Sequence, residues 1–224
     1  MKKIIACVFV LFLGSAVYAE EPGKNQNFDF VTGGDIVSSY VWRGVKFGNG
    51  PAVQPYLEMN AGNFTLGTWG SVNMTDREAA EADLYASYTF DFGLNLGLTD
   101  YYYPGTDYFD YSNTSGSHGF ELNLGYEHAG LKISANYMLN EAPAAGTAGG
   151  DMYFQLGYGF DQFSIFAGAG DGWHTSDRDF NVCNIGINVS REIVVTDQFS
   201  LPVFGSAILN PDTEQYYLVL GISI

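Results

Sequence analysis

Apolar and polar residues alternate with a period of two along most of the chain. In the clearest segment, residues 81–90, small apolar and aromatic residues hold the even positions, while Glu81, Asp83 and Tyr85 lie at odd ones. This period is that of a β-strand with two unlike faces. Twelve such segments follow one another: 28–42, 53–61, 64–73, 81–90, 94–103, 120–127, 131–137, 151–158, 163–170, 183–190, 199–209 and 215–224. Most are close to the ten residues with which a tilted strand crosses a bilayer.

The connections between these segments alternate in length. Short turns are expected at 61–63, 91–93, 128–130 and 161–162, with a longer one at 192–198. Longer polar connections lie between them, at 44–52, 74–80, 104–117, 140–150, 171–179 and 210–213. Short periplasmic turns alternating with longer outer loops are typical of outer-membrane barrels, and an even strand number places both termini in the periplasm.

A soluble β-sandwich would also alternate, but two features count against it. Its solvent face should carry Lys and Glu, whereas the polar face here is often Gly, Ser, Asn and Tyr. Aromatic residues also gather at strand ends, where membrane barrels form interfacial girdles; they include Tyr40, Trp42, Tyr88, Phe90 and Tyr101. Since hydrocarbon offers no hydrogen bonds, every strand edge must be paired. We therefore expect an all-β chain forming a single antiparallel up-and-down transmembrane β-barrel of about 12 strands.

The first residues have the composition of a secretory signal peptide. Lys2 and Lys3 precede the short apolar run 4–13, and Val17 and Ala19 supply the small residues of a cleavage site. We expect residues 1–19 to be removed during export through the periplasm, and residues 20–224 to form the barrel. The rest of the chain has no run of 18 apolar residues, so spanning helices are not expected.

Charge and cysteine content exclude several kinds of partner. The formal net charge is −16, and removal of Lys2 and Lys3 takes it to −18. Phosphate backbones need Lys and Arg, so no nucleic acid is expected. Only Cys183 remains after cleavage, which leaves no intrachain disulfide and no CxxC site. We expect Cys183 to face lipid, and we expect no cofactor and no metal.

The inward positions predict a lumen that is acidic on balance. We expect the pore to be lined by the following residues: Asp35, Arg43, Gln54, Glu58, Trp69, Glu81, Asp83, Tyr85, Glu121 and Asp151. Rings of like charge select by sign, which favours cations or neutral polar solutes. The alternative is a barrel filled by Arg–carboxylate pairs and Tyr side chains. Arg43, near a strand end, is expected to pair with an acid. Trp69 either points inward as a stacking platform or belongs to a girdle, displaced by a bulge.

Short histidine motifs raise the hypothesis of a lipid hydrolase. His174-Thr175-Ser176 and Ser117-His118 each place Ser and His close in sequence. A hydrolase needs Ser, His and an orienting third group within mutual reach. With three His in the chain, chance matches of this length are expected. We therefore expect no enzyme activity, and a hydrolase is the weakest alternative.

Nearly the whole mature chain resembles the bacterial TorF family of porin-like proteins, most densely from Ser38 to Gly105. The resemblance rests on SSYVWRG followed by PAVQ, on GTWGS, on EADLY and on YYYPG. It implies an outer-membrane channel. From this and the polar inner face we expect an outer-membrane porin for passive diffusion of small polar solutes. The last strand, with Tyr216, Leu218, Leu220 and Ile222, resembles a barrel-assembly signal, although Ile224 replaces the usual terminal Phe.

Several functional alternatives stay open beside the passive channel. One is a solute-specific channel of the nucleoside or sugar type, and another is a plugged structural or adhesive barrel. The expected partners are outer-membrane lipid, small polar solutes and the barrel-assembly machinery. Self-association into a homo-oligomer is left open.

Overall fold

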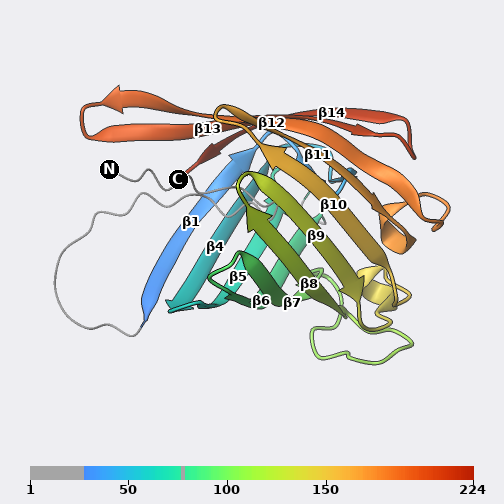
Figure 1. Ribbon diagram of the computed structural model, residues 1–224. Helices are drawn as coiled ribbons and strands as arrows, with labels where there is room; N and C mark the ends of the chain where they lie inside the picture. The colour runs from blue at the N-terminus through green and yellow to red at the C-terminus, as the bar shows by residue number, and fades with distance from the viewer. Residues whose placement is uncertain (1–27, 77–78) are drawn as a thin grey trace.

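The computed structural model describes residues 28–76 and 79–224, so the predicted signal peptide 1–19 lies outside the described residues. Twelve antiparallel strands form one closed barrel, in which each strand lies beside its sequence neighbour and the last returns to the first (Figure 1). The strands are β1 Asp29–Val37, β4 Ala52–Ala61, β5 Phe64–Asn73, β6 Ala80–Thr89, β7 Leu94–Tyr102, β8 His118–His128, β9 Leu131–Met138, β10 Met152–Gly159, β11 Phe163–Gly170, β12 Asn181–Thr196, β13 Phe199–Asn210 and β14 Gln215–Ser223. The predicted twelve-stranded barrel is confirmed.

Two 3₁₀-helices, η1 Pro143–Ala145 and η2 Gly172–His174, lie in the longer connections. Among the described residues, no helix is long and apolar enough to span a membrane.

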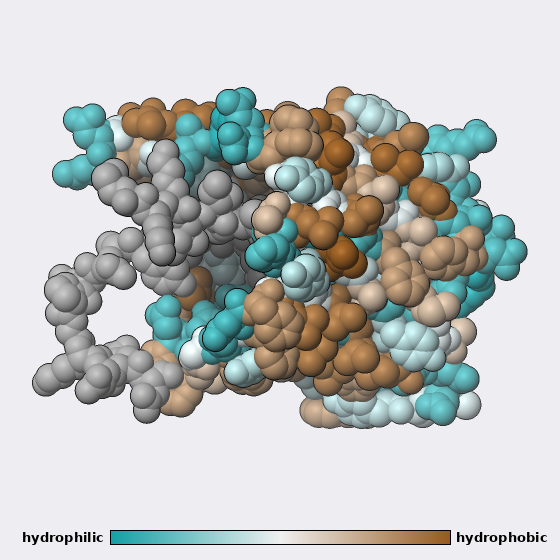
Figure 2. All heavy atoms as spheres, viewed as in Figure 1, coloured by the Kyte–Doolittle hydropathy of each residue, from teal (hydrophilic) through white to brown (hydrophobic). Residues whose placement is uncertain are grey.

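The barrel is apolar outside and polar inside, the reverse of a soluble protein. Leu57, Leu84 and Leu156 point outward and are each at least half exposed, while Asp83 and Tyr56 on the same strands are buried. Figure 2 shows apolar residues over much of the barrel wall and polar residues gathered at its two ends. Such a surface is stable only when it is covered by lipid or other apolar groups.

The segment 28–42 is not one strand, as the alternation predicted. The wall strand β1 ends at Val37, and the chain then turns into the barrel as a hairpin of β2 Tyr40–Trp42 and β3 Val45–Phe47. Arg43 and Gly44 form its turn with φ of 50° and 83°, as a two-residue hairpin turn requires. We call residues 40–47 the plug hairpin. Tyr40 and Trp42 are buried within it, so their expected place in a girdle is wrong.

The closure between β1 and β14 is short. Asp35–Val37 pair with Gly221–Ser223, and backbone hydrogen bonds extend this ladder by one residue at each end. By contrast, β1 pairs with β4 along its whole length. Because the chain leaves the wall after Val37, β14 has no β1 partner for Gln215–Val219. We call this short ladder the seam.

The hairpin of β12 and β13 is longer than predicted. The connection expected at 192–198 is wrong, because β12 continues to Thr196 and β13 starts at Phe199. Beyond Val189, β12 no longer pairs with β11, so the two strands project past the barrel as a ribbon (Figure 1).

Candidate functional site

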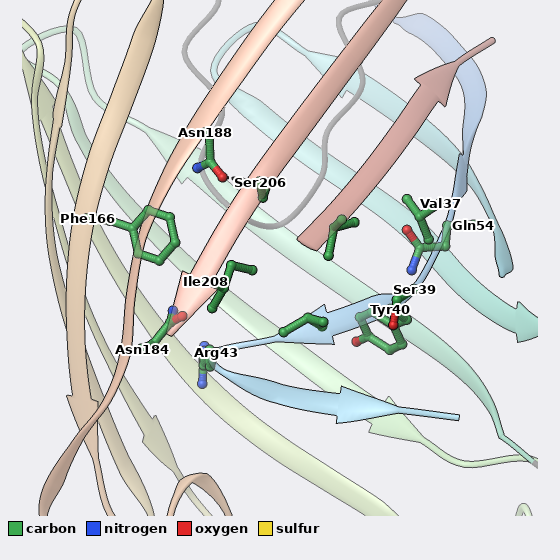
Figure 3. A pocket seen from close by; sticks show the side chains of 12 residues that line it. Val37, Ser39, Tyr40, Arg43, Gln54, Phe166, Asn184, Asn188, Ser206 and Ile208 are labelled. Carbon is green, nitrogen blue, oxygen red and sulfur yellow. Dashed lines mark hydrogen bonds between the residues drawn. The ribbon is translucent and has the colours of Figure 1, made fainter. Parts of the chain in front are cut away.

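The tip of the plug hairpin is fixed inside the lumen by polar contacts from several strands. The Arg43 guanidinium donates two hydrogen bonds to the Glu121 carboxylate, at 2.6 and 2.8 Å. It also stacks on the rings of Trp42 and Tyr153, 4.4 and 4.6 Å from their centroids. The Asn210 amide donates to the Gly44 carbonyl at 3.0 Å. Arg43 therefore pairs with an acid, as expected, but from the hairpin and not from the barrel wall. Figure 3 shows Arg43 at the end of the hairpin, near Asn184 of the wall strand β12.

The turn residue Gly44 permits close contact with the wall. A Cβ at this position would lie 1.9 Å from the Cys183 carbonyl oxygen, closer than any side chain allows. Cys183 lies at a bulge in the β11–β12 ladder and is fully buried, so the expectation that it faces lipid is wrong.

Aromatic rings fill the lumen around the hairpin. Tyr40 stacks on Phe47 at 5.1 Å and tilts against Trp69 at 5.5 Å between centroids. Trp42 meets Tyr101 and Trp173 edge-on. Trp69 thus points inward, which rules out its place in a girdle, but Tyr40 covers it. Tyr101, expected in a girdle, is also buried inside and donates to Glu121 at 3.0 Å.

His174, in the loop helix η2, lies against the plug hairpin. It is buried, its Nε2 accepts a hydrogen bond from the Trp173 indole at 3.2 Å, and this nitrogen lies 3.5 Å from the Arg43 guanidinium. Burial, and to a lesser extent the charge of Arg43, hold the pKa of His174 well below its ordinary value. The ring is therefore neutral at physiological pH.

Most of the predicted acids are held by contacts within the protein and do not line an open channel. Asp35 accepts from Ser223 at 2.6 Å, and Gln54 donates to Ser71 at 3.3 Å. Asp151 accepts from Thr147 and lies 3.7 Å from Arg178.

Glu81 and Asp83 are buried side by side on β6, each with one carboxylate oxygen that lacks a hydrogen-bond partner among the described residues. The side chains of Glu81 and Asp83 thus point into the lumen, as predicted, but the plug hairpin or the neighbouring loops cover them.

A cavity of about 360 Å³ occupies the other half of the lumen. Of the predicted residues, Arg43, Glu58 and Tyr85 line it. Along β6 the inward side chains pass from buried at Glu81, Asp83 and Tyr85 to exposed at Thr89, next to a short turn. The cavity therefore ends blindly at the plug hairpin and opens toward the short turns.

One wall of this cavity is made of residues that were not predicted as site residues. They are Asn123, Asn136, Gln155 and Asn184. The alternation already assigned each of them to the inward face. Their residue types did not distinguish a ligand-binding role from simple packing in the lumen, because these side chains are uncharged and the prediction of the pore lining relied mainly on charge.

The histidine motifs do not assemble a hydrolase triad. His118 points outward, and its two nitrogens lie within hydrogen-bond distance of Asp100 (2.9 Å) and of the Tyr108 carbonyl. Ser117 donates instead to the Asp107 carbonyl at 2.8 Å. In the described part of the chain, no serine hydroxyl bonds to His118 or His174, and no cluster of three or more His, Cys, Asp or Glu could hold a metal ion.

Comparisons with known proteins give a family and several distant structures. The profile of a family described as "Bacterial protein of unknown function (Gcw_chp)" matches residues 21–198. No curated protein matches the chain. The name TorF does not occur among these matches, so that resemblance stays a prediction.

Solved porins and a phospholipase are similar at low identity. A mutant Rh. blastica porin is 15% identical with a TM-score of 0.43, and the alignment covers 77% of this chain but 55% of that one. This chain thus spans about half the length of the Rh. blastica porin. KdgM porin is 12% identical, with a TM-score of 0.46, over 86% of this chain and 98% of that one. Outer membrane phospholipase A from Escherichia coli is 12% identical, with a TM-score of 0.42, over 85% and 88%.

Proposed function

The chain belongs to the Gcw_chp family of bacterial proteins of unknown function, and we propose that it is an outer-membrane channel for small polar solutes whose outer half is held shut by its own hairpin. The observation that carries this proposal is a closed barrel with an apolar outer wall and a polar cavity of about 360 Å³ that stops at the plug hairpin. A closed barrel can span hydrocarbon without unpaired edges, and the polar interior suits water-soluble cargo.

The charge inside the barrel supports a preference for cations or neutral solutes. Inward acids outnumber inward bases, and the one arginine at the plug tip is neutralised by Glu121. Anions entering the cavity would meet Glu58 and Glu127 without an uncompensated positive charge beside them. Rings of one sign repel ions of that sign.

Planar bilayer recordings test the proposal. Full-length mature protein is compared with a variant in which residues 40–47 are replaced by a short Gly-Ser linker. A variant with the exposed 105–115 loop shortened serves as the control, because it leaves the plug hairpin intact. Gel mobility with and without heating checks that each barrel is folded.

We expect rare, small openings in the wild type and in the loop control, and steady currents when the hairpin is removed. In a KCl gradient, the reversal potential should indicate cation preference. A folded variant without the hairpin that carries no current would contradict the channel and favour a structural barrel. Clear anion preference would contradict the charge assignment.

A further inference from the structure

We propose that the cavity binds a neutral polyhydroxylated solute of monosaccharide size, through a belt of side-chain amides on one wall. The cavity is the inner half of the same lumen, so this inference rests on the proposed channel function and adds the class of solute. Its volume of about 360 Å³ lies at the lower end of the range for small-molecule sites, about 300–1,000 Å³.

The strand register brings the amides to one level of the barrel. Asn123 on β8 pairs directly with Asn136 on β9, and Asn136 pairs with Tyr153 on β10. Gln155 on β10 lies opposite Gly168 on β11, which in turn lies opposite Asn184 on β12. We call Asn123, Asn136, Gln155 and Asn184 the amide belt. Gly168 has no side chain, so the ring of Tyr153 lies over it and its hydroxyl reaches across the strand.

Hydrogen bonds within the wall hold the belt in place. Asn123 donates to Asn136 at 3.0 Å and to Glu121 at 2.7 Å. The Tyr153 hydroxyl donates to Gln155 at 2.7 Å and accepts from Asn184 at 2.8 Å. A site whose polar groups are already oriented loses less entropy when a ligand binds.

Two groups of the belt remain free to bind a ligand. The Asn184 side-chain oxygen is buried, has no hydrogen-bond partner among the described residues and belongs to a residue that lines the cavity. The Gln155 amide nitrogen likewise has no partner in the described part of the chain, and the Gln155 oxygen lies 3.2 Å from the Asn184 nitrogen. A hydroxyl group both donates and accepts, so it can satisfy a free acceptor and a nearby free donor together.

Each charged group next to the belt already has a partner within the protein. Both terminal nitrogens of Arg43 bond to Glu121, which neutralises the charge that would attract a carboxylate or phosphate. Glu58, on the opposite side, accepts from the Tyr85 hydroxyl at 2.7 Å. Glu127, nearer the short turns, lies 3.9 Å from Lys132. The belt itself is uncharged, so it offers hydrogen bonds without selecting for a charged ligand.

Three sugars with the same type of ring but different charges test this class of ligand. Glucose is neutral, glucuronate is anionic and glucosamine is cationic at pH 7. Binding is measured by saturation-transfer NMR on the mature protein in phosphocholine micelles, because maltoside detergents would themselves present sugar. The measurement does not depend on conduction, so it separates failure of this inference from failure of the channel.

We expect glucose to bind in preference to the two charged sugars. Asn184→Leu should weaken glucose binding roughly tenfold, since it removes the unpaired acceptor and its orienting contact. Asn63→Leu, at an exposed turn outside the cavity, should leave binding unchanged. The near-isosteric Gln155→Glu should shift preference toward glucosamine. Preference of the wild type for a charged sugar, absence of all sugar binding, or unchanged glucose affinity in the folded Asn184→Leu variant would each overturn the inference.

Discussion

Arg43 determines the position of the plug hairpin because its charge has to be compensated inside the barrel. Its side chain is 10% exposed and that of Glu121 is 1% exposed, so neither charge has bulk water to replace its partner. Removing one member of a buried pair leaves the other charge without compensation, which costs about 3–5 kcal/mol.

Glu121→Gln is therefore expected to destabilise the closed plug by several kcal/mol and to raise the frequency of channel openings. The measurements are urea unfolding in micelles and single-channel recording. Glu58→Gln is the matched control, since it neutralises a cavity carboxylate that bonds to a tyrosine and not to the hairpin. Equal behaviour of the two variants would contradict the role of the Arg43–Glu121 pair.

His174 should make the stability of the barrel fall in acid. Its pKa in the folded protein is far below the ordinary value of 6.5, so the unfolded chain binds the proton more readily. The contribution of His174 to the free energy of unfolding is fully present above about pH 6.5. It declines below that value by about 1.4 kcal/mol per pH unit until the pKa of the folded state is reached.

His174→Gln keeps a hydrogen-bond acceptor but cannot titrate, so its unfolding midpoint in urea should depend less on pH between 7.5 and 5.5. Trp42 and Trp173 both contact the ring, so tryptophan fluorescence reports the local change. Identical pH slopes in the wild type and the variant would show that other groups cause the acid sensitivity.

Among the elements, the plug hairpin is the one that the alternation of apolar and polar residues could not predict. Alternation indicates which face of a strand a residue lies on, but not whether that strand belongs to the barrel wall. Tyr40 and Trp42 satisfy the pattern of a lipid-facing girdle and also that of a filled lumen. The Arg43-Gly44 turn and the excess length of the segment 28–42 were the available signals.

The 104–117 loop is anchored on the outer wall by His118. The imidazole stacks between Tyr102 and Tyr111, at 5.2 and 4.5 Å between ring centroids. Its two nitrogens face the Asp100 carboxylate and the Tyr108 carbonyl, which are both acceptors. The loop is therefore held by a buried polar contact as well as by ring stacking.

His118→Phe keeps a ring but removes both polar contacts, so the loop should open more often. Hydrogen bonds to charged groups contribute about 1.5–3 kcal/mol, which corresponds to at least a tenfold larger open population. Limited proteolysis of the loop in micelles measures this change. His128→Phe, at an exposed position beside a short turn, is the control and should leave the cleavage rate unchanged.

At the scale of the whole molecule, the seam is the weakest part of the wall. The ladder between β1 and β14 is short, whereas β12 and β13 pair from Ile185 to Thr196. Local opening occurs first where few backbone hydrogen bonds hold neighbouring segments together.

A disulfide across the seam should therefore stabilise the barrel more than one placed elsewhere, because it reinforces the short ladder and also closes a far longer loop of the unfolded chain. In a Cys183→Ser background, Ile36→Cys with Ile222→Cys joins directly paired residues of β1 and β14. The control, Ile187→Cys with Ala207→Cys, joins β12 to β13. We expect the seam disulfide to add about 2–4 kcal/mol and the control to add less, as measured by thermal unfolding under oxidising and reducing conditions. Equal gains would mean that the seam does not open first.

The barrel could be predicted from the sequence because lipid imposes the same demand on every strand. Each outward position has to be apolar, from Leu57 to Leu220, so the signal repeats twelve times. The interior imposes no such uniform demand. An inward tyrosine such as Tyr85 can face water, a ligand or an inserted hairpin. The residue types therefore do not determine what fills the lumen, and only the structure shows it.

The position of the plug hairpin also has a consequence for the order of assembly. The hairpin follows the first wall strand, β1, whereas β14, which closes the barrel against β1, is synthesised after the other described strands. Ser38 and Leu220 bond to each other across 182 residues of sequence. The aromatic interior can therefore be sealed only after β14 has paired with β1, and until that moment it stays accessible to solvent and to other proteins.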